Sequence, residues 1–215
     1  TCALPISKAT VEQAAKLSPS HPRVAYVKAV QLYREKRYDD ARKLLVSMLA
    51  TVPSNLPGLM LMGQVTSAAG RLDLAQQAFA TYMLRAPNDL AARRMLGGTL
   101  LRKGQPQLAI SVLEPVPEKA DDPGYLALAA ESNRQLGRAR RAEDLLERAL
   151  KVDPKNADLR IGLGMARLAR GDRKAAAADF EAAIALVPDS SKADRPLVMM
   201  WLAAGDADKA DKAAN

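Results

Sequence analysis

The sequence predicts an all-α fold in which antiparallel helix pairs repeat along the chain. Composition favours helices, because aromatic residues make up only 4% of the chain while alanine and leucine are abundant. Three residue types also recur at a spacing of 33 or 34 positions, apart from one double step of 67 between Pro87 and Pro154, and this period is typical of a repeat of helix pairs. They are the prolines Pro19, Pro53, Pro87, Pro154 and Pro188, the glycines Gly70, Gly104, Gly137, Gly171 and Gly205, and the alanines Ala41, Ala75, Ala109, Ala142, Ala176 and Ala210.

The stretch Leu56–Asp89 shows the local pattern best. Its first helix has one packing face at helical spacing: Leu59, Met62, Gly63 and Thr66. Gly70 provides the permissive backbone that ends this helix, and Pro87 ends the second helix. Small residues recur at one position of successive first helices, where we expect them to let the paired helices approach closely: Ala29, Gly63, Gly97, Ala130 and Gly164.

This arrangement resembles the tetratricopeptide repeat (TPR), and the resemblance covers residues 7–215. It implies a right-handed superhelical solenoid, which we expect to be truncated in mid-repeat at both ends. The predicted divisions are a partial repeat at 7–21, full repeats at 22–55, 56–89, 90–122, 123–156 and 157–190, and a partial repeat at 191–215.

Two departures from the repeat involve proline. Pro115 and Pro117 predict that the second helix of the third repeat stops near Glu114, and a one-residue deletion fits there. We expect this connection to be a kink or hinge. Pro196 predicts that the last first helix begins close to it.

A narrower resemblance links two repeats to the TPR lipoproteins that accompany bacterial exosortase (PEP-CTERM) and exopolysaccharide systems. The stretches concerned are Asn88–Val116, with its Leu-Glu-Pro end, and Gly162–Asp194. The resemblance implies an envelope-associated scaffold of a Gram-negative bacterium, on the periplasmic side and anchored through an N-terminus that this chain lacks. The alternative location is the cytoplasm.

Residues 1–6 fit no repeat position, and they include Cys2, the only cysteine of the chain. Thr-Cys-Ala-Leu-Pro-Ile is the translation of ACG TGT GCT CTT CCG ATC, the end of a common sequencing adapter. We therefore expect residues 1–6 to be a non-native tail, so Cys2 carries no information on lipidation or catalysis.

The sequence offers little catalytic chemistry. His21 is the only histidine, so no histidine triad or histidine-based metal cluster can form within the chain. We assign it a linker or capping role. We expect no catalytic residues, metal or cofactor, and no enzymatic activity. No apolar run reaches the length of a membrane span.

We expect a protein or peptide segment to bind in the concave groove that first helices form in TPR arrays. Carried over by register, the groove residues are Arg23, Tyr26, Val30, Met60, Gln64, Arg94, Gly98, Arg102, Glu131, Ile161 and Met165. The Lys/Asn clamp of co-chaperone TPR domains is not reproduced. An alternative is that several of these residues only pack against the neighbouring repeat.

The net charge of +8 raises a second hypothesis, the binding of an anionic polymer such as RNA or polysaccharide. The densest basic cluster gives the candidate contacts Arg134, Arg138, Arg140 and Arg141. We favour a solvated turn whose arginines face Glu143, Asp144 and Glu147, and we do not expect nucleic acid as the partner. A third hypothesis is a regulatory TPR segment of a larger enzyme.

Overall fold

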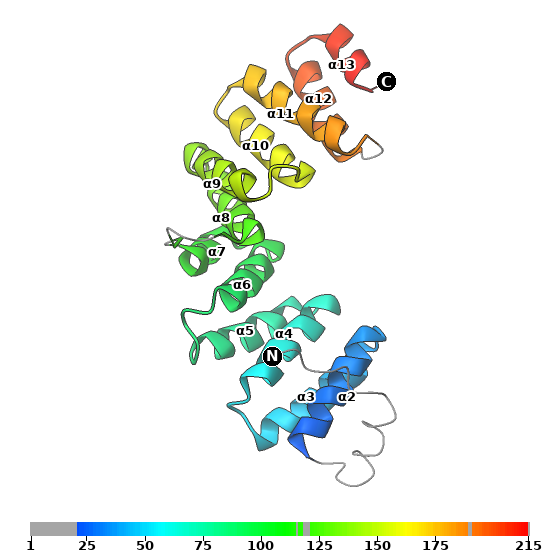
Figure 1. Ribbon diagram of the computed structural model, residues 1–215, viewed down its shortest axis with the longest axis vertical. Coiled ribbons are helices and arrows are strands. Elements are labelled where there is room, and N and C mark those ends of the chain that lie inside the picture. The colour runs from blue at the N-terminus through cyan, green and yellow to red at the C-terminus, as the bar shows by residue number, and fades with distance from the viewer. Residues whose placement is uncertain (1–20, 115, 118–120, 189–190, 215) are drawn as a thin grey trace. The chain divides into compact units, whose positions relative to one another are not determined.

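The computed structural model describes residues 21–114, 116–117, 121–188 and 191–214. Every regular element in these ranges is a helix, which confirms the predicted all-α class (Figure 1). Two compact units share the helices: one extends to Lys103 and the other begins at Gly104. The predicted tail at 1–6 and, apart from His21, the predicted partial repeat at 7–21 lie outside the described residues.

The first unit consists of two helix pairs and one further first helix. Its helices are α2 (Pro22–Arg34), α3 (Tyr38–Thr51), α4 (Leu56–Ala68), α5 (Leu72–Met83) and α6 (Leu90–Arg102). Each helix packs against the next along the chain, and α4 also contacts α2 and α6. First helices therefore touch the first helices of neighbouring repeats.

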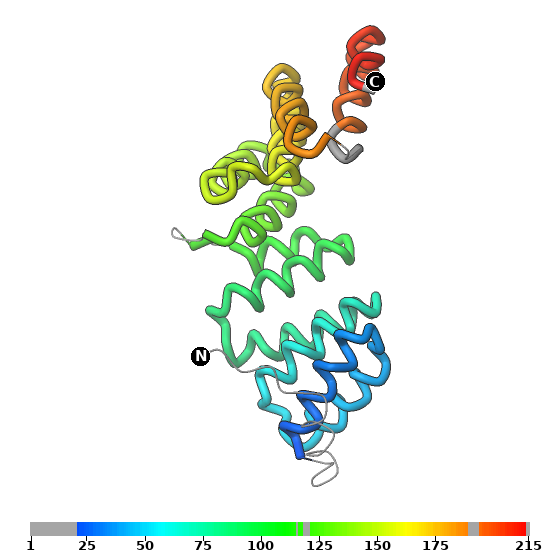
Figure 2. Tube along the Cα trace, turned by 45° about the vertical axis from the view of Figure 1, so that its right-hand side comes forward, coloured from blue at the N-terminus to red at the C-terminus, as the bar shows by residue number. Residues whose placement is uncertain are grey.

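The second unit repeats this arrangement. Its helices are α7 (Pro106–Leu113), α8 (Pro123–Gln135), α9 (Ala139–Val152), α10 (Ala157–Ala169), α11 (Arg173–Leu186), α12 (Ser191–Ala203) and α13 (Ala207–Ala214). Here α10 contacts the first helices α8 and α12 as well as its own partner α11. Figure 2 shows the tight turns that reverse the chain between paired helices.

A polar side chain caps the start of five first helices. The capping residues are His21, Asn55, Asp89, Asp122 and Asn156, and each accepts a hydrogen bond from a backbone N–H in the first turn. This bond satisfies a donor that the helix itself leaves unpaired. The capping role predicted for His21 is therefore confirmed, and the other four caps show that the position belongs to the repeat.

The turn between paired helices has a positive φ in the described repeats. The glycines there are Gly70, Gly104, Gly137, Gly171 and Gly205, with φ between 69° and 87°. At the equivalent position of the pair α2 and α3 stands Lys36, with φ of 60°. The Cβ atom of any other residue disfavours this conformation, which glycine adopts without that penalty.

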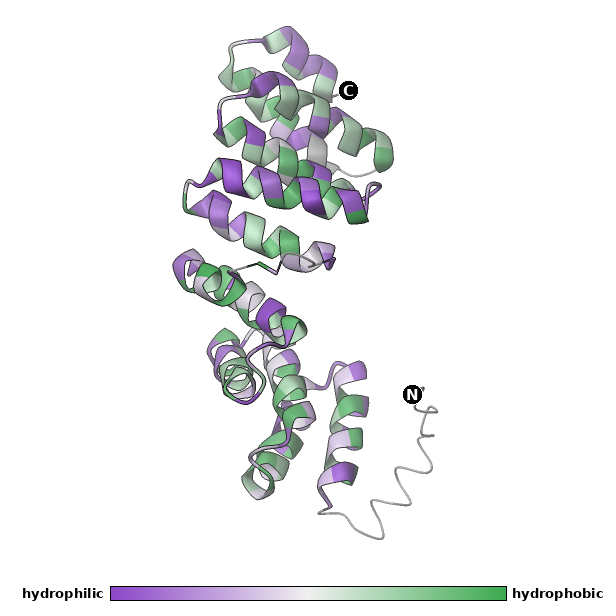
Figure 3. Ribbon diagram, turned by 60° about the vertical axis from the view of Figure 1, so that its left-hand side comes forward, coloured by the Kyte–Doolittle hydropathy of each residue, from purple (hydrophilic) through white to green (hydrophobic). Residues whose placement is uncertain are grey.

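The predicted close approach of paired helices is confirmed where glycine faces an aromatic ring. A Cβ added to Gly63 would lie 2.3 Å from Cε1 of Phe79, and one added to Gly164 would lie 2.6 Å from Cε1 of Phe180. Both rings are buried. Figure 3 shows hydrophobic and hydrophilic residues alternating along the helices, as expected when one face of each helix packs inward.

Helix α7 is only eight residues long and ends at Leu113, which confirms the predicted stop near Glu114. Side chains of the next pair bind the chain that follows. The buried Tyr125 hydroxyl donates to the Leu113 carbonyl, and Nη2 of Arg148 donates to the Pro117 carbonyl at 3.1 Å. These bonds satisfy backbone acceptors that the missing helical turns leave free.

The prediction for Pro196 is wrong. Helix α12 begins at Ser191, five residues earlier, and Pro196 lies inside it. Proline has no N–H, so it cannot donate to the carbonyl four residues before it. The helix therefore continues through a position that lacks one backbone hydrogen bond.

Candidate peptide-binding face

Successive first helices form a shared surface in each unit. We call the surface made by α8, α10 and α12 the first-helix face of the second unit. Because α10 contacts both neighbours, side chains from three repeats can meet there. The predicted groove residues fall on the first helices of both units.

On α2 the core takes up part of the predicted groove. Tyr26 and Val30 are half-buried and pack against a buried cluster that includes Ala29 and Leu45. Arg23 is exposed at the start of the helix. At Tyr26 and Val30 the alternative of packing within the fold therefore describes the contacts observed.

On α4 and α6 the predicted residues remain partly accessible. Those that are half-buried are Met60, Gln64, Arg94 and Gly98. Arg102 is exposed, and its Nη1 donates to Oγ of Ser67 at 2.7 Å. This bond ties α6 to α4 and leaves Arg102 less free to contact a ligand.

On the second unit the predicted residues have different environments. Ile161 and Met165 are half-buried and pack against a buried cluster that includes Phe180 and Leu197. Glu131 instead lines a pocket of about 320 Å³ between α8 and α10. The sequence thus identified one residue of this pocket through its groove register.

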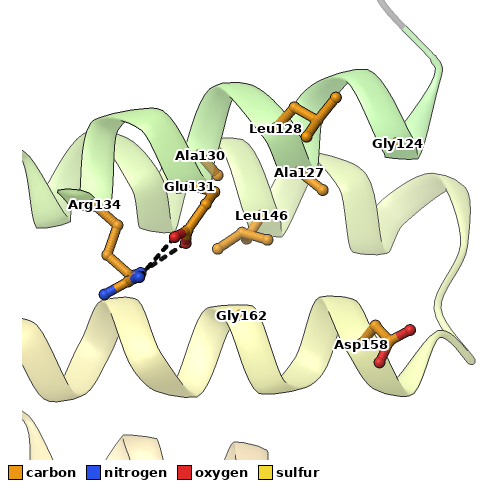
Figure 4. Close-up of a pocket in the computed structure, with 9 residues that line it drawn as sticks. All are labelled: Gly124, Ala127, Leu128, Ala130, Glu131, Arg134, Leu146, Asp158 and Gly162. Carbon is orange, nitrogen blue, oxygen red and sulfur yellow. Dashed lines mark hydrogen bonds and ion pairs between the residues drawn. The ribbon is translucent and has the colours of Figure 1, made fainter. Parts of the chain in front are cut away.

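The pocket is apolar in its centre and polar at its two ends (Figure 4). Its lining comprises Gly124, Ala127, Leu128, Ala130, Glu131 and Arg134 from α8, Leu146 from α9, and Asp158 and Gly162 from α10. Small side chains leave the space open, and Leu146 closes its base opposite Gly162. The volume is at the lower end of the range for ligand pockets, and suits one or two side chains of a bound segment.

One end of the pocket holds a double hydrogen bond between Arg134 and Glu131. Nε and Nη2 of Arg134 donate to the two carboxylate oxygens at 2.8 and 2.7 Å, and Gln135 donates to Oε1 of Glu131 at 2.7 Å. Burial alone would raise the pKa of Glu131, but these bonds and the arginine charge outweigh it and hold that pKa below its ordinary value. The pair therefore stays ionised at neutral pH.

The opposite end carries Asp158 at the start of α10. None of the nine lining residues is histidine, cysteine, serine or lysine. What the arrangement can do is receive an apolar side chain in the centre and hydrogen-bond its flanks at the two ends.

The candidate basic contacts separate into paired and unpaired residues. Arg134 binds Glu131, and Nε of Arg141 lies 3.3 Å from Oε1 of Glu114. Arg138 and Arg140 are exposed and form no ion pair with any residue that the structure describes. The four arginines therefore do not act as one unpaired basic cluster.

The expectation that these arginines face Glu143, Asp144 and Glu147 is wrong for the two glutamates. Both accept from Arg167 of α10, with Nε 3.0 Å from Glu143 and Nη2 2.9 Å from Glu147. The remaining guanidinium nitrogen of Arg167, Nη1, lies 2.7 Å from Oδ2 of the buried Asp179. Burial raises the pKa of Asp179 more than Arg167 and Arg160 lower it.

Sequence reasoning missed a contact that occurs at the same register in two repeats. Asn133 donates to Glu114 at 3.2 Å, and Arg167 donates to Glu147 at 2.9 Å. The two donors are 34 positions apart. The two acceptors are only 33 positions apart, because the one-residue deletion lies between Glu114 and Glu147 but not between Asn133 and Arg167. Aligning polar positions as well as small and apolar ones would have found it.

In the described ranges no helix has the length and apolarity that a membrane crossing requires. The same residues contain no group of three or more histidine, cysteine, aspartate or glutamate side chains that could hold a metal ion.

Comparison with known families gives matches along most of the chain. One tetratricopeptide repeat model matches residues 5–55, 128–191 and 162–214, and a second one matches residues 66–131. The β-barrel assembly-enhancing protease of Yersinia pestis is 32% identical over 88 residues, which are 41% of this chain and 18% of that protein. The chain therefore matches less than a fifth of the length of this relative.

Solved structures share the fold at low identity. YrrB, described as a TPR protein with an unusual peptide-binding site, gives a TM-score of 0.73 at 19% identity and covers 91% of this chain and 97% of its own. PilW, described as a type IV pilus biogenesis factor, gives a TM-score of 0.77 at 17% identity, and the match covers 89% of this chain and 90% of PilW. MamA from Desulfovibrio magneticus RS-1 gives a TM-score of 0.72 at 22% identity, and the match covers 79% of this chain and 97% of that MamA chain.

Proposed function

The chain belongs to the tetratricopeptide repeat family, and on that premise we propose that it is a non-catalytic scaffold whose first helices bind a peptide segment of a partner protein. Helix pairs of this kind offer a repeated surface and no reactive centre, and the peptide-binding description of YrrB fits the proposal. Each unit has a surface of this kind, because within each unit the first helices contact one another.

The pocket between α8 and α10 carries the proposal. It opens between first helices of adjacent repeats, and its polar ends frame an apolar centre. The ionised pair of Glu131 and Arg134 keeps hydrogen-bonding capacity at one end, and Asp158 supplies a carboxylate at the other. A bound segment can place a side chain in the centre and direct its own polar groups to these ends.

The test uses peptides selected on the immobilised chain from a random dodecapeptide library. Dissociation constants are then measured by fluorescence polarisation for Ala127→Trp, which fills the pocket, and for Ala178→Trp, which adds the same side chain at an exposed position of α11. We expect Ala127→Trp to weaken binding at least about tenfold and Ala178→Trp to leave it unchanged. Equal loss in both variants, or no selectable peptide, contradicts the proposal.

We further propose that the scaffold serves bacterial envelope or exopolysaccharide assembly. The resemblance of Asn88–Val116 and Gly162–Asp194 to the exosortase-associated lipoproteins supports this role. The Yersinia pestis relative is itself named for β-barrel assembly. The proposed location is the periplasmic side of the envelope, with an anchor outside this chain.

Fractionation of cells that express the complete gene tests this role. We expect the protein in a membrane fraction that resists high salt and dissolves in detergent, because a lipid anchor holds by apolar contact. Recovery in the cytoplasmic fraction contradicts the envelope role and leaves peptide binding in place.

A further inference from the structure

A second hollow lies on the first-helix face of the second unit, between α10 and α12. It has a volume of about 520 Å³. Its lining comprises Met165 and Leu168 from α10, Arg173 from the start of α11, and Arg195, Pro196, Met199, Met200 and Ala203 from α12. The α12 residues follow the spacing i, i+1, i+4, i+5 and i+8, so they lie along one side of that helix.

Methionine dominates the apolar wall of this hollow. Met200 is buried and belongs to the core, whereas Met199 is 64% exposed and nearby Leu202 is 53% exposed. Leaving such large apolar side chains in water is costly, and exposed apolar surface beside a hollow is typical of a contact site. Methionine side chains adapt to ligands of different shape.

The charges around the hollow have one sign. Arg173 and Arg195 are exposed, and neither forms an ion pair with any residue in the described ranges. No carboxylate is among the described residues that line the hollow. Asp172, next to Arg173, caps α11 through the N–H of Ala175 at 3.0 Å, and Asp194 lines a different hollow together with Lys209.

We infer that this hollow binds an acidic protein segment, in which a large apolar side chain enters the methionine-lined space and flanking carboxylates bind Arg173 and Arg195. The inference rests on the proposed function and specifies the chemistry of the partner at one place on the same face. Apolar contact anchors the segment, while the two arginines select its charge. A basic segment meets two uncompensated positive charges at the rim and is rejected.

A second copy of this chain is a poorer occupant than an acidic partner. The chain carries a net charge of +8, so two copies repel each other as they approach. An acidic segment is attracted by the same charge. The charge of the chain therefore favours a foreign acidic segment.

The probe is a fluorescein-labelled decapeptide with two central leucines and two glutamates on each side. One counterpart replaces the glutamates with lysine, and another replaces the leucines with alanine. We expect the glutamate–leucine peptide to bind the chain at least about tenfold more tightly than either counterpart in fluorescence polarisation at physiological salt. Equal binding of the lysine peptide overturns the inference.

Two variants locate the site. Arg173→Glu/Arg195→Glu should weaken binding of the glutamate–leucine peptide at least about tenfold, because two attractive contacts become repulsive. The same change should strengthen binding of the lysine peptide, because two repulsive contacts become attractive. Arg138→Glu/Arg140→Glu carries the same charge change at exposed positions that form no ion pair with the described residues, and should leave the peptide affinity within about twofold. Equal weakening by both variants shows a diffuse charge effect and overturns the inference.

The apolar part of the site has its own variant. Met199→Ser should weaken the glutamate–leucine peptide about threefold to tenfold, since it removes apolar contact from an exposed position that the fold does not need. Leu84→Ser, at a side chain that is 84% exposed in the first unit, is the matched control and should leave binding unchanged. Thermal unfolding followed by circular dichroism checks that each variant is folded.

Other outcomes separate this inference from the function on which it rests. Suppose that library peptides bind and that Ala127→Trp weakens their binding, while Arg173→Glu/Arg195→Glu leaves the affinity for the glutamate–leucine peptide unchanged. The inference then fails and the peptide-binding function stands. If neither library nor acidic peptides bind, both fail. If sedimentation equilibrium shows a dimer that Arg173→Glu/Arg195→Glu dissociates, a second copy is the occupant and the inference is overturned.

Discussion

The pairs α2–α3 and α4–α5 occupy successive repeats of the first unit but fill the same packing position differently. In the pair α2–α3 the small residue is Ala29 and the large residue at the facing position is Leu45. In the pair α4–α5 these positions hold Gly63 and Phe79, whose ring lies where a Cβ of residue 63 would be. The smaller residue accompanies the larger partner.

Both residue combinations, alanine with leucine and glycine with phenylalanine, also occur in the second unit. Ala130 with Leu146 follows the alanine–leucine choice, and Gly164 with Phe180 follows the glycine–phenylalanine choice. Close packing conserves the summed volume at such a position, so the two residues cannot be chosen independently. In the repeats that hold these four pairs, the small and the large residue therefore share one volume.

The largest expected effect comes from breaking this match in the pair α4–α5. Gly63→Ala should destabilise the chain by about 2 kcal/mol, because the new Cβ overlaps a buried ring and the gain in helix propensity offsets only part of the strain. Phe79→Leu should relieve the overlap. Adding it to Gly63→Ala should therefore give a coupling energy of about 1–2 kcal/mol in urea unfolding followed by circular dichroism.

The same cycle in the pair α2–α3 is the control. Leu45→Phe alone should destabilise, and Ala29→Gly added to it should recover part of the loss. Additive effects in both cycles would show that the paired residues do not share one volume.

A smaller effect is expected at the helix caps. Asn55 accepts from the N–H of Gly58 at 2.7 Å, whereas Nδ1 of His21 accepts from the N–H of Arg23 at 3.2 Å. Asn55→Ala should cost about 1 kcal/mol, and His21→Ala less, since the longer bond is weaker. Thermal unfolding of both variants tests the order, and a larger loss from His21→Ala would contradict it.

The sequence predicts those features that depend on local backbone rules. Turn glycines, small residues in first helices and the stop of α7 before Pro115 follow from φ preferences, the helical period and the missing proline N–H. The small–large match of Gly63 with Phe79 was also present in the sequence, but it becomes visible only when positions of two helices are read together.

The partners of long polar side chains were not predictable in the same way. Arg134 pairs within its own helix, whereas Arg167 reaches Glu143 and Glu147 on the preceding helix. Helical spacing describes only the first kind of contact, because the second depends on which face of the next repeat approaches. The pocket at Glu131 likewise depends on small residues that two first helices bring together.

The turns of the two pairs provide a further prediction. Lys36 adopts φ of 60° where Gly70 adopts 74°. Lys36→Gly should stabilise the chain by about 0.5–1 kcal/mol, because glycine enters this region without the Cβ penalty, and Gly70→Lys should destabilise by a similar amount. Opposite shifts of the urea midpoint are expected, and a loss of stability in Lys36→Gly would contradict the argument.

The smallest effect concerns pH and distinguishes the cap of α6 from that of α4. The Tyr82 hydroxyl donates to Asp89 at 2.7 Å and, with backbone N–H groups, holds the pKa of Asp89 below its ordinary value of 3.8. Because this pKa is lower in the folded chain, the contribution is complete above the unfolded pKa and is lost as pH falls through the folded one.

Asp89→Asn should therefore reduce the loss of stability between pH 5 and pH 3 by a few tenths of a kcal/mol while keeping the cap. Asn55→Asp is the reciprocal control, since Met48 stands where Tyr82 stands one repeat later and gives the new carboxylate no hydroxyl donor. Urea midpoints across this pH range measure both changes. If Asn55→Asp adds as much pH dependence as Asp89→Asn removes, the effect belongs to the cap carboxylate alone and the tyrosine is not its source.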